Sequence, residues 1–359
     1  MAGGVGSRFW PMSTSDKPKQ FIDVLGTGKT LLQLTVDRFG SLVKSENIWV
    51  VTNQKYAAIV KEQLPDMPEG NILCEPCRRN TAPCIAYVSW RIKSKDPKAN
   101  IVVTPSDHIV TDKAEFQRVV KECMVFTSET DSIVTLGMKP NRPETGYGYI
   151  QADLSTSSLR NKEIFRVDSF REKPDLETAK EYLAAGNYVW NAGIFVWNVR
   201  TIVEELRKHA PQISDTMDRI AASFGSWKEE EVLKELFPTC EKISIDYAVM
   251  EKSDRICTVA SDLGWSDLGG YSSIKANIPL PDDDPMPDKG SLEQAKYDNR
   301  MVGQGIELHD CEGCIVHADD GHRVIVQGLK DYIVAVKGSN VLVCSLSEEQ
   351  KIKEYSQKK

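Results

Sequence analysis

The sequence predicts an α/β protein: a Rossmann-like, mostly parallel mixed sheet with helices on both faces, followed by a small C-terminal β-domain. Two observations support this. Short β-rich runs alternate with helical patterns over roughly the first 275 residues, and closely spaced short strands replace them after Asn299. Alternating strands and helices favour a parallel sheet covered on both faces. Strands spaced about 8–12 residues apart favour a compact β-only unit.

Each element of the large sheet has its own signal. Apolar runs predict buried strands at 48–52, 101–104 and 133–136. Apolar residues at helical spacing predict helices at 31–39, 81–93 and 114–126, and a further helical stretch over 201–236. The helix at 81–93 starts Thr-Ala-Pro, which suggests an N-cap at Thr81 and a proline in the first turn.

The domain boundaries follow from these patterns. We expect a large domain over 1–275, a linker or surface loop over 276–300 and a β-helix-like domain over 301–359. The linker contains the proline- and acid-rich run 279–288, which has no apolar periodicity. The small domain should hold strands near 306–309, 314–317, 323–326, 332–336 and 341–344, then a charged helix at 348–353.

Composition limits the function classes. The chain has 359 residues, is 41% hydrophobic and carries a formal net charge of -7. An acidic chain without basic blocks is a poor candidate for binding long nucleic acids. No run approaches the ~18 apolar residues that span a bilayer, and the N-terminus does not resemble a signal peptide. We therefore expect a cytoplasmic protein that contacts neither nucleic acid nor membrane.

The nine cysteines predict reduced thiols rather than a disulfide framework. Two Cys-x-x-Cys pairs, Cys74/Cys77 and Cys311/Cys314, leave a zinc site open, and His309 and His317 flank the second pair. The two pairs lie more than 200 residues apart, unlike those of compact zinc ribbons. Buried or half-buried thiols are the favoured interpretation.

The glycine-rich opening is the most informative segment. Gly3, Gly4 and Gly6 precede Arg8, and a Pro-Lys pair ends at Lys19. Glycines let backbone N–H groups approach phosphates closely, and the two cations add fixed positive charge for a triphosphate. The alternative is a glycine turn with solvated surface cations.

Two nearby patterns resemble known nucleotide-binding motifs but are incomplete. Gly26-Thr-Gly-Lys-Thr30 ends like a P-loop, but Asp23 stands where the first glycine is required. Phe9 likewise replaces the third glycine of a dinucleotide-binding fingerprint.

Two aspartates are candidate metal ligands. Ser106 and Asp107 follow a predicted buried strand, and Asp267 lies in a glycine-rich turn after another apolar run. Ligands bind at the carboxyl ends of such strands, and Mg²⁺ prefers one or two carboxylates plus phosphate oxygens and water. Together with the cationic loop, they fit phosphoryl-type transfer, in which positioning and charge neutralisation dominate. A sugar phosphate is already an anion and needs no general base.

These residues resemble the signature of the sugar nucleotidyltransferases, G-G-x-G-x-R-x-x-P…P-K, over 3–19. More narrowly, the chain is similar to the mannose-1-phosphate guanylyltransferase branch. The matching segments follow in the expected order at 75–83, 105–108, 144–150, 170–174, 190–195, 244–251 and 264–267.

The resemblance implies GTP and mannose 1-phosphate as substrates, Mg²⁺ as cofactor and a homodimer held through the β-domain. It implies roles that fall into four groups. Arg8, Lys19 and Lys173 would bind phosphates; Gly3, Gly4, Gly6, Glu75, Arg79, Asn80, Thr81 and Ser106 would bind the nucleotide; Gly146, Tyr147, Glu172, Asn191, Ala192 and Gly193 would bind the sugar; and Asp107 and Asp267 would bind the metal.

The family pattern also places an apolar strand just before the glycine loop, where this sequence has only Met1 and Ala2. Two alternatives remain open. The chain could use another sugar or base, or it could be a non-catalytic regulatory subunit, although Lys19, Asp107 and Asp267 are all present. A glycosyltransferase is disfavoured, since Ser-Asp-His at 106–108 is not an Asp-x-Asp motif.

Overall fold

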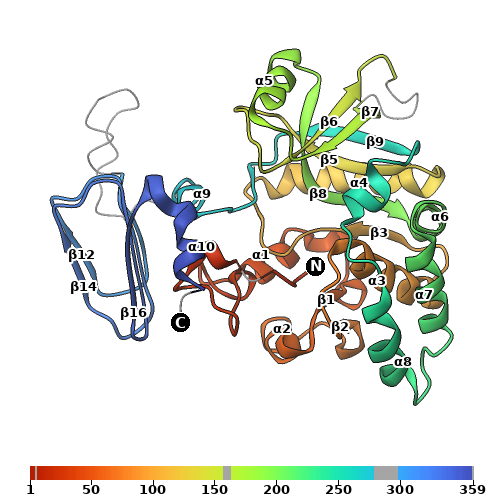
Figure 1. Ribbon diagram of the computed structural model, residues 1–359, viewed down its shortest axis with the longest axis horizontal. Coiled ribbons are helices and arrows are strands. Elements are labelled where there is room, and N and C mark those ends of the chain that lie inside the picture. Colours follow the sequence, from red (N-terminus) through yellow and green to blue (C-terminus); the bar gives the residue numbers. More distant parts are fainter. Residues whose placement is uncertain (5, 157–162, 279–297, 358–359) are drawn as a thin grey trace. The chain divides into compact units, whose positions relative to one another are not determined.

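The computed structural model describes residues 1–4, 6–156, 163–278 and 298–357. The chain folds into two compact units, each described separately below (Figure 1). The first comprises 1–3, 36–105 and 110–265; the second comprises 4–35, 106–109 and 266–359. The predicted linker run 279–288 lies outside the described residues.

The first unit is built on a six-stranded sheet of order β3-β8-β5-β9-β7-β6. The bounds of its strands are Asn100–Val103 (β3), Ile133–Met138 (β5), Gly148–Asp153 (β6), Ile164–Glu172 (β7), Tyr188–Asn198 (β8) and Ile256–Ser261 (β9). Each of the three strands predicted for the large sheet overlaps an observed one, the first of them in a separate pair described below. The predicted α/β class is confirmed.

Parallel pairing is less frequent in this sheet than we expected. Among the described strands of this sheet, only β5 and β9 run parallel, while β8 is antiparallel to β3, β5 and β6, and β7 is antiparallel to β6 and β9. The long strand β8 lies between β3 and β5 and runs against both. An apolar run predicts that a strand is buried, but it does not predict the direction of the strand.

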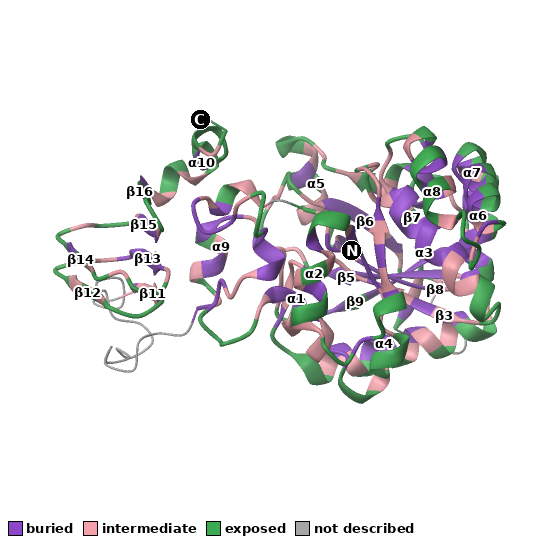
Figure 2. Ribbon diagram, turned by 90° about the horizontal axis from the view of Figure 1, so that it is seen from below, coloured by how far each residue is buried: buried purple, intermediate pink, exposed green. Residues whose placement is uncertain are grey.

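Helices cover both faces of this sheet (Figure 2). Alternate residues of a strand point to opposite faces, so Ile133 joins one apolar cluster and Val134 the other. The first cluster includes residues of α3 (Thr81–Lys95), α6 (Val199–His209) and α7 (Pro211–Ala221), and the second includes residues of α4 (Lys113–Glu129). The sheet is therefore buried on both sides, as predicted.

The remaining helices are short. Their bounds are Leu31–Asp37 (α1), Ala57–Gln63 (α2), Leu176–Ala185 (α5), Glu229–Leu236 (α8), Tyr271–Lys275 (α9) and Ile352–Tyr355 (α10). One prediction was wrong: the N-cap of α3 is Asn80, not Thr81. The Asn80 side chain accepts a hydrogen bond from Thr81 N at 2.9 Å, and Asn80 adopts a φ of 68°. Asparagine tolerates a positive φ better than threonine.

Strands β1 (Val50–Asn53) and β2 (Ile72–Glu75) form a separate parallel pair in the first unit. Ala2 extends this pair with one isolated parallel bridge to Thr52. Ala2 N donates to Val51 O at 2.9 Å, and the Met1 amino group donates to Thr104 O at 3.0 Å, just beyond β3. These two residues thus hydrogen-bond to both β1 and the residue that follows β3.

The second unit contains the predicted β-helix-like domain. Two parallel ladders alternate along the chain, β11-β13-β15 and β12-β14, and β16 adds an antiparallel edge to the first. The strand bounds are Arg300–Val302 (β11), Ile306–His309 (β12), Ile315–Ala318 (β13), Val324–Gln327 (β14), Tyr332–Lys337 (β15) and Asn340–Ser345 (β16). The predicted final helix is a 3-10 helix, η10 (Leu346–Lys351), that runs into α10.

All nine cysteines are free, and each is buried or half-buried, as predicted. The thiols of Cys311 and Cys314 lie 3.3–3.5 Å from backbone carbonyl oxygens. Within 1–4, 6–156, 163–278 and 298–357, no group of three or more His, Cys, Asp or Glu residues could hold a metal ion. No helix in these ranges is long and apolar enough to cross a membrane.

Candidate active site

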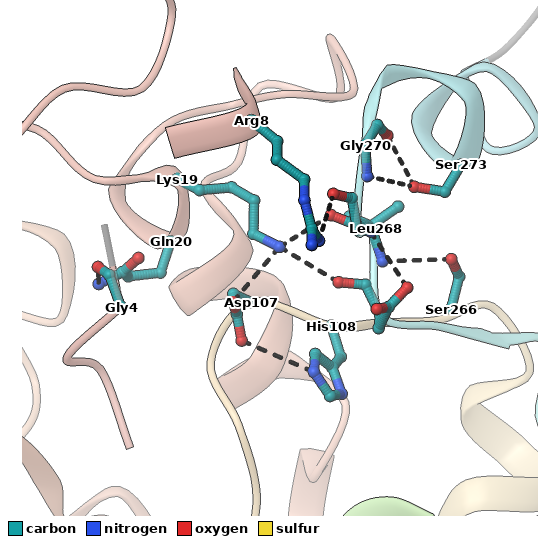
Figure 3. A network of polar contacts seen from close by, with 12 residues as sticks. Gly4, Arg8, Lys19, Gln20, Asp107, His108, Ser266, Leu268, Gly270 and Ser273 are labelled. Atoms are coloured by element: carbon teal, nitrogen blue, oxygen red, sulfur yellow. Dashed lines mark hydrogen bonds and ion pairs between the residues drawn. The ribbon is translucent and has the colours of Figure 1, made fainter. Parts of the chain in front are cut away.

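A buried lysine is the centre of the polar cluster in the second unit (Figure 3). Lys19, which starts the 3-10 helix η2 (Lys19–Phe21), is only 4% exposed. Its ammonium group lies 3.3 Å from Asp107 Oδ2 and donates to the carbonyl oxygens of Asp267 at 3.1 Å and Leu268 at 2.9 Å. A buried charge needs such partners to be tolerated, and here a carboxylate and two carbonyls supply them.

The glycine loop is shaped to admit this lysine. Gly6 has a φ of 63°, and a Cβ there would lie 2.7 Å from Lys19 Cβ, so both conformation and space require glycine. Gln20 donates to Gly4 O at 3.0 Å and so ties the loop to η2. A Cβ added at Gly3 or Gly4 would meet nothing within 4 Å. The backbone on that side is open to a phosphate.

Asp107 carries a negative charge at neutral pH. Burial works against ionisation, but the charges of Lys19 and His108 outweigh it, so the pKa of this carboxyl group is lowered. His108 Nε2 lies 3.8 Å from Asp107 Oδ1.

Asp267 sits in a tight turn after β10 (Trp265–Ser266). Its Oδ1 accepts from Gly269 N at 3.1 Å, and Leu268 adopts a φ of 48°. Arg8 donates to Gly269 O at 3.3 Å, and the Arg8 and Lys19 side chains both reach this turn (Figure 3). The second unit therefore brings together the two predicted metal-ligand aspartates and two of the predicted phosphate-binding cations.

The donor set around Lys19 fits a divalent cation with its phosphate ligands. Two carboxylates leave most of an octahedral shell for phosphate oxygens and water, which is the coordination Mg²⁺ favours. Arg8 and Lys19 both bring positive charge to the turn that carries Asp267. Ser106, another predicted residue, is buried beside Asp107.

The first unit holds a different cluster, rich in acceptors. Glu172, at the end of β7, has a side chain only 9% exposed. Its Oε1 pairs with Lys173 Nζ, whereas Oε2 is buried and has no hydrogen-bond partner among the residues described. A buried carboxylate oxygen without a donor is unusual and is suited to accept hydroxyl groups of a ligand.

Asp246 lies in the same cluster, at the start of the π-helical turn Asp246–Met250. Its Oδ1 accepts from Asn191 Nδ2 at 3.0 Å. Burial and the nearby Glu172 charge raise the pKa of Asp246 to about 6, while the Asn191 hydrogen bond and Lys173 act in the opposite direction. Asn191 Oδ1 in turn accepts from Gly193 N at 3.0 Å, which fixes the orientation of the amide.

Lys173 provides the positive charge of this cluster. Burial lowers the pKa of the ammonium group, but the hydrogen bond and charge of Glu172 outweigh it, so the net pKa is raised. The Lys173 backbone donates to Tyr147 O at 3.2 Å. A Cβ at Gly148 would lie 2.3 Å from Glu172 Oε2, which explains a glycine at that position.

The other predicted sugar-binding residues lie on β8 or just before β6. Ala192 is buried beside Asn191 on β8, and Gly193 has a φ of 67°. Gly146 N donates to Glu144 Oε1 at 3.0 Å. The Tyr147 ring packs edge-on against Trp190 with centroids 5.2 Å apart.

The predicted nucleotide-binding residues at 75–81 have structural partners in the first unit. Arg79 donates to Pro238 O, Asn80 caps α3, and Thr81 Oγ1 accepts from Ile245 N at 2.9 Å. Glu75 differs from them, because its Oε1 is buried and has no hydrogen-bond partner among the described residues. Burial raises its pKa to about 7, against the effects of the Cys84 hydrogen bond and nearby cations.

Sequence reasoning missed three residues of these clusters. Asp246 lies within the matched segment 244–251, but the sequence analysis predicted no role for it. It also predicted no role for Gln20 or Gly148. A carboxylate in an otherwise apolar stretch, Ile245 to Met250, was the one available signal for Asp246.

Comparisons with known proteins agree with this chemistry. The nucleotidyl transferase family matches residues 1–278. Mannose-1-phosphate guanylyltransferase of Escherichia coli K12 is 34% identical over 98% of this chain and 71% of its own length. Alginate biosynthesis protein AlgA of Pseudomonas syringae pv. tomato is 34% identical over 99% of this chain and 70% of its own length.

Two solved structures are also similar. One is described as mannose-1-phosphate geranyltransferase from Thermus thermophilus; it superposes with a TM-score of 0.84 at 31% identity, covering 99% of this chain and 96% of the other. A second, described as mannose-6-phosphate isomerase from Helicobacter pylori, has a TM-score of 0.58 at 27% identity and covers 74% of this chain and 98% of the other.

Proposed function

The chain belongs to the nucleotidyl transferase family, and we propose that it joins GTP and mannose 1-phosphate into GDP-mannose with release of pyrophosphate. The observation that carries the sugar-phosphate part is the buried Glu172 Oε2, which has no hydrogen-bond partner among the described residues and lies on the side chain that pairs with Lys173. A sugar phosphate offers hydroxyl donors to the first and an anion to the second.

The reaction needs no general base. An oxygen of the ionised sugar phosphate attacks the α-phosphorus of the nucleotide and forms a new P–O bond. The bond from the α-phosphorus to the bridging oxygen breaks, and that oxygen leaves with pyrophosphate. Negative charge grows on the oxygens around the α-phosphorus, and Arg8 and Lys19 are the cations that stabilise it.

Asp107 and Asp267 would hold Mg²⁺. Both belong to the Lys19 cluster, and Asp107 is kept ionised by its cationic neighbours. When bound, the ion would neutralise phosphate oxygens and hold them in line for displacement.

Guanine is the base that Glu75 would favour. Guanine presents two adjacent donors, N1–H and the N2 amino group, which a carboxylate can accept together. Adenine offers an acceptor at N1 and has no amino group at C2. Glu75 Oε1 lacks a partner among the described residues, and binding such donors would favour the ionised carboxylate over the protonated form.

The homodimer remains part of the proposal. Val341 and Val343 are 61% and 55% exposed on the edge strand β16, and Ile325 is 54% exposed on β14. A second copy of the chain could cover these apolar side chains. Light scattering after size-exclusion chromatography would measure the mass, and a monomer at micromolar concentration would contradict this part.

The decisive experiment is pyrophosphate release with Mg²⁺, testing GTP, ATP, UTP and dTTP against mannose 1-phosphate and glucose 1-phosphate. We expect release that requires both GTP and mannose 1-phosphate. Faster release with another pair would replace the substrates, and no release from folded protein would favour the binding-subunit alternative.

A further inference from the structure

The C-terminal 3-10 helix η10 carries one acid that turns inward. Glu349 Oε2 accepts from Ser272 N at 2.9 Å, and Oε1 accepts from Ser272 Oγ at 2.6 Å. Its neighbour Glu348 is exposed and pairs with Lys351, one turn along the same segment. Glu349 therefore fastens η10 to the start of α9, five residues after Asp267, through two hydrogen bonds to a charged acceptor.

Gly270 shows how closely this carboxylate approaches the loop. A Cβ at Gly270 would lie 2.6 Å from Glu349 Oε2 and 2.7 Å from its carboxyl carbon. The φ of Gly270 is -160°, an extended conformation open to any residue. An alanine Cβ at 270 would have to displace the Glu349 carboxylate, so the two positions form one latch.

The latched loop carries most of the phosphate and metal chemistry of the second unit. Residues 267–269 supply the Asp267 carboxylate, two carbonyl acceptors for Lys19 and one for Arg8. Gly270 and Ser273 are tied to each other by hydrogen bonds of 3.1 and 2.7 Å. A displacement of Ser272 would therefore also shift Asp267, because only a short segment with its own hydrogen bonds separates the two residues.

The same C-terminal region also braces the glycine loop. Ile352 of α10 is fully buried and belongs to the apolar cluster that contains Phe9, which follows Arg8. Tyr271 OH donates to Phe9 O at 3.3 Å, and Lys337 Nζ donates to Met12 O at 2.5 Å. The C-terminal region thus contacts the glycine loop through Ile352 and Lys337 and the Asp267 loop through Glu349.

We infer that Glu349 is a positioning residue for the metal and triphosphate site, and that the C-terminal domain sets the geometry of that site. The inference rests on the proposed function, because it takes Asp267 as a metal ligand. It assigns this domain a part in nucleotide and metal binding in addition to subunit contact. Sugar-phosphate recognition, which lies in the first unit, should not depend on the latch.

The test compares Glu349→Ala, Glu349→Gln, Gly270→Ala and the double variant of Glu349→Ala with Gly270→Ala, using Glu348→Ala as the matched control on the same helix. Mn²⁺ binding in the presence of GTP, followed by the loss of the free-ion electron paramagnetic resonance signal, gives a readout independent of turnover. Mg²⁺ half-saturation, kcat and the KM for mannose 1-phosphate are measured alongside, with Tm as the check on folding.

Glu349→Ala and Gly270→Ala should each weaken Mn²⁺ binding and raise Mg²⁺ half-saturation about 10-fold, the scale of a lost hydrogen bond to a charged group. The KM for mannose 1-phosphate should stay unchanged. Glu349→Gln should recover part of the loss because its amide oxygen still accepts. In the Glu349→Ala background, Gly270→Ala should add less than about 2-fold, since coupled residues are not additive. Glu348→Ala should match wild type.

Three results would overturn the inference. The first is wild-type Mn²⁺ binding in Glu349→Ala, even with a lower Tm, because that describes a purely structural contact. The second is a double variant in which the losses of Mn²⁺ affinity from Glu349→Ala and Gly270→Ala multiply, because that would show that the two residues act independently. The third is a wild-type chain that binds neither GTP nor Mn²⁺, which would remove the premise. A wild-type chain that binds both but releases no pyrophosphate would contradict only the proposed reaction. Mn²⁺ binding by the variants would still test whether Glu349 positions the metal site.

Discussion

The polar clusters of the two units differ in how their charges are matched. In the second unit, the ammonium group of Lys19 contacts one carboxylate and two carbonyls, and the pKa of Asp107 is lowered. In the first unit, acceptors outnumber donors: Glu172 Oε2 has no partner among the described residues, and the pKa of Asp246 is raised to about 6. The first arrangement resembles a preorganised electrostatic site, and the second lacks the donors that a polyhydroxylated ligand would bring.

The largest expected effect comes from removing the charge of the matched cluster. Lys19→Met keeps much of the side-chain length but leaves Asp107 beside two unopposed carbonyls. We expect kcat to fall by about 10²–10³, the usual scale for losing a preorganised charge-stabilising group. The pKa of Asp107 should rise, because Lys19 opposes the effect of burial.

Pyrophosphate release under saturating GTP and Mg²⁺ measures this change. Lys29→Met is a suitable control, because Lys29 is exposed in a turn of the same unit. A Lys19 variant that turns over at the wild-type rate would contradict the claim that the charge of Lys19 stabilises the reaction.

A second substitution separates the carboxylate of Asp267 from the turn it stabilises. Asp267→Asn retains an oxygen that can accept from Gly269 N, so the loop should keep its shape. The loss of one anionic ligand should raise Mg²⁺ half-saturation about 10- to 100-fold, the range seen when a metal site loses support. Mg²⁺ titration of pyrophosphate release measures it, with Asp262→Asn as the control. Unchanged metal dependence would exclude Asp267 as a ligand.

The two clusters also differ in how readily the sequence predicts them. The glycines, Arg8 and Lys19 lie within 17 residues, and spacing alone predicted a phosphate cradle. Asp246 and Asn191 lie 55 residues apart and come together only because β8 and the turn after Ile245 fold to the same place. A hydrogen bond between distant side chains leaves no local pattern in a sequence.

The same distinction applies to the fold. Apolar runs predicted the buried strands β3 and β5, because burial is a property of each run. The antiparallel direction of β8 was not predictable, since it depends on which neighbours the strand meets. Glu349 was expected to lie on a charged terminal helix, and only its contact with Ser272 distinguishes it from Glu348.

An intermediate effect is expected at Glu75. Glu75→Gln keeps the shape of the side chain but replaces one acceptor oxygen with an amide donor. We expect the ratio of kcat/KM for GTP over ATP to fall about 10-fold or more, because a buried polar group facing the wrong partner costs about 1–3 kcal/mol. Parallel assays with both nucleotides measure the ratio, with Glu69→Gln as an exposed control. A ratio equal to that of wild type would remove Glu75 from base recognition.

The smallest expected effect concerns the acceptor-rich cluster of the first unit. It tests whether the buried Asp246 carboxylate serves ligand binding and lowers the free energy of unfolding. The pKa of Asp246 is raised to about 6 from an ordinary value near 3.8. The folded protein therefore holds this proton more tightly than the unfolded chain. Stability falls as the pH rises between those two values and stays lower above pH 6.

Asp246→Asn removes that cost and keeps an acceptor for Asn191. We expect the variant to be more stable than wild type at pH 8 by on the order of 1 kcal/mol, with the difference vanishing near pH 4. The KM for mannose 1-phosphate should rise several-fold at pH 8, while Mg²⁺ half-saturation should not change. Thermal unfolding across this pH range, together with both kinetic constants, measures these effects. A variant that is less stable than wild type at pH 8 would mean that the Asp246 charge is satisfied within the protein, and the contrast between the two clusters would disappear.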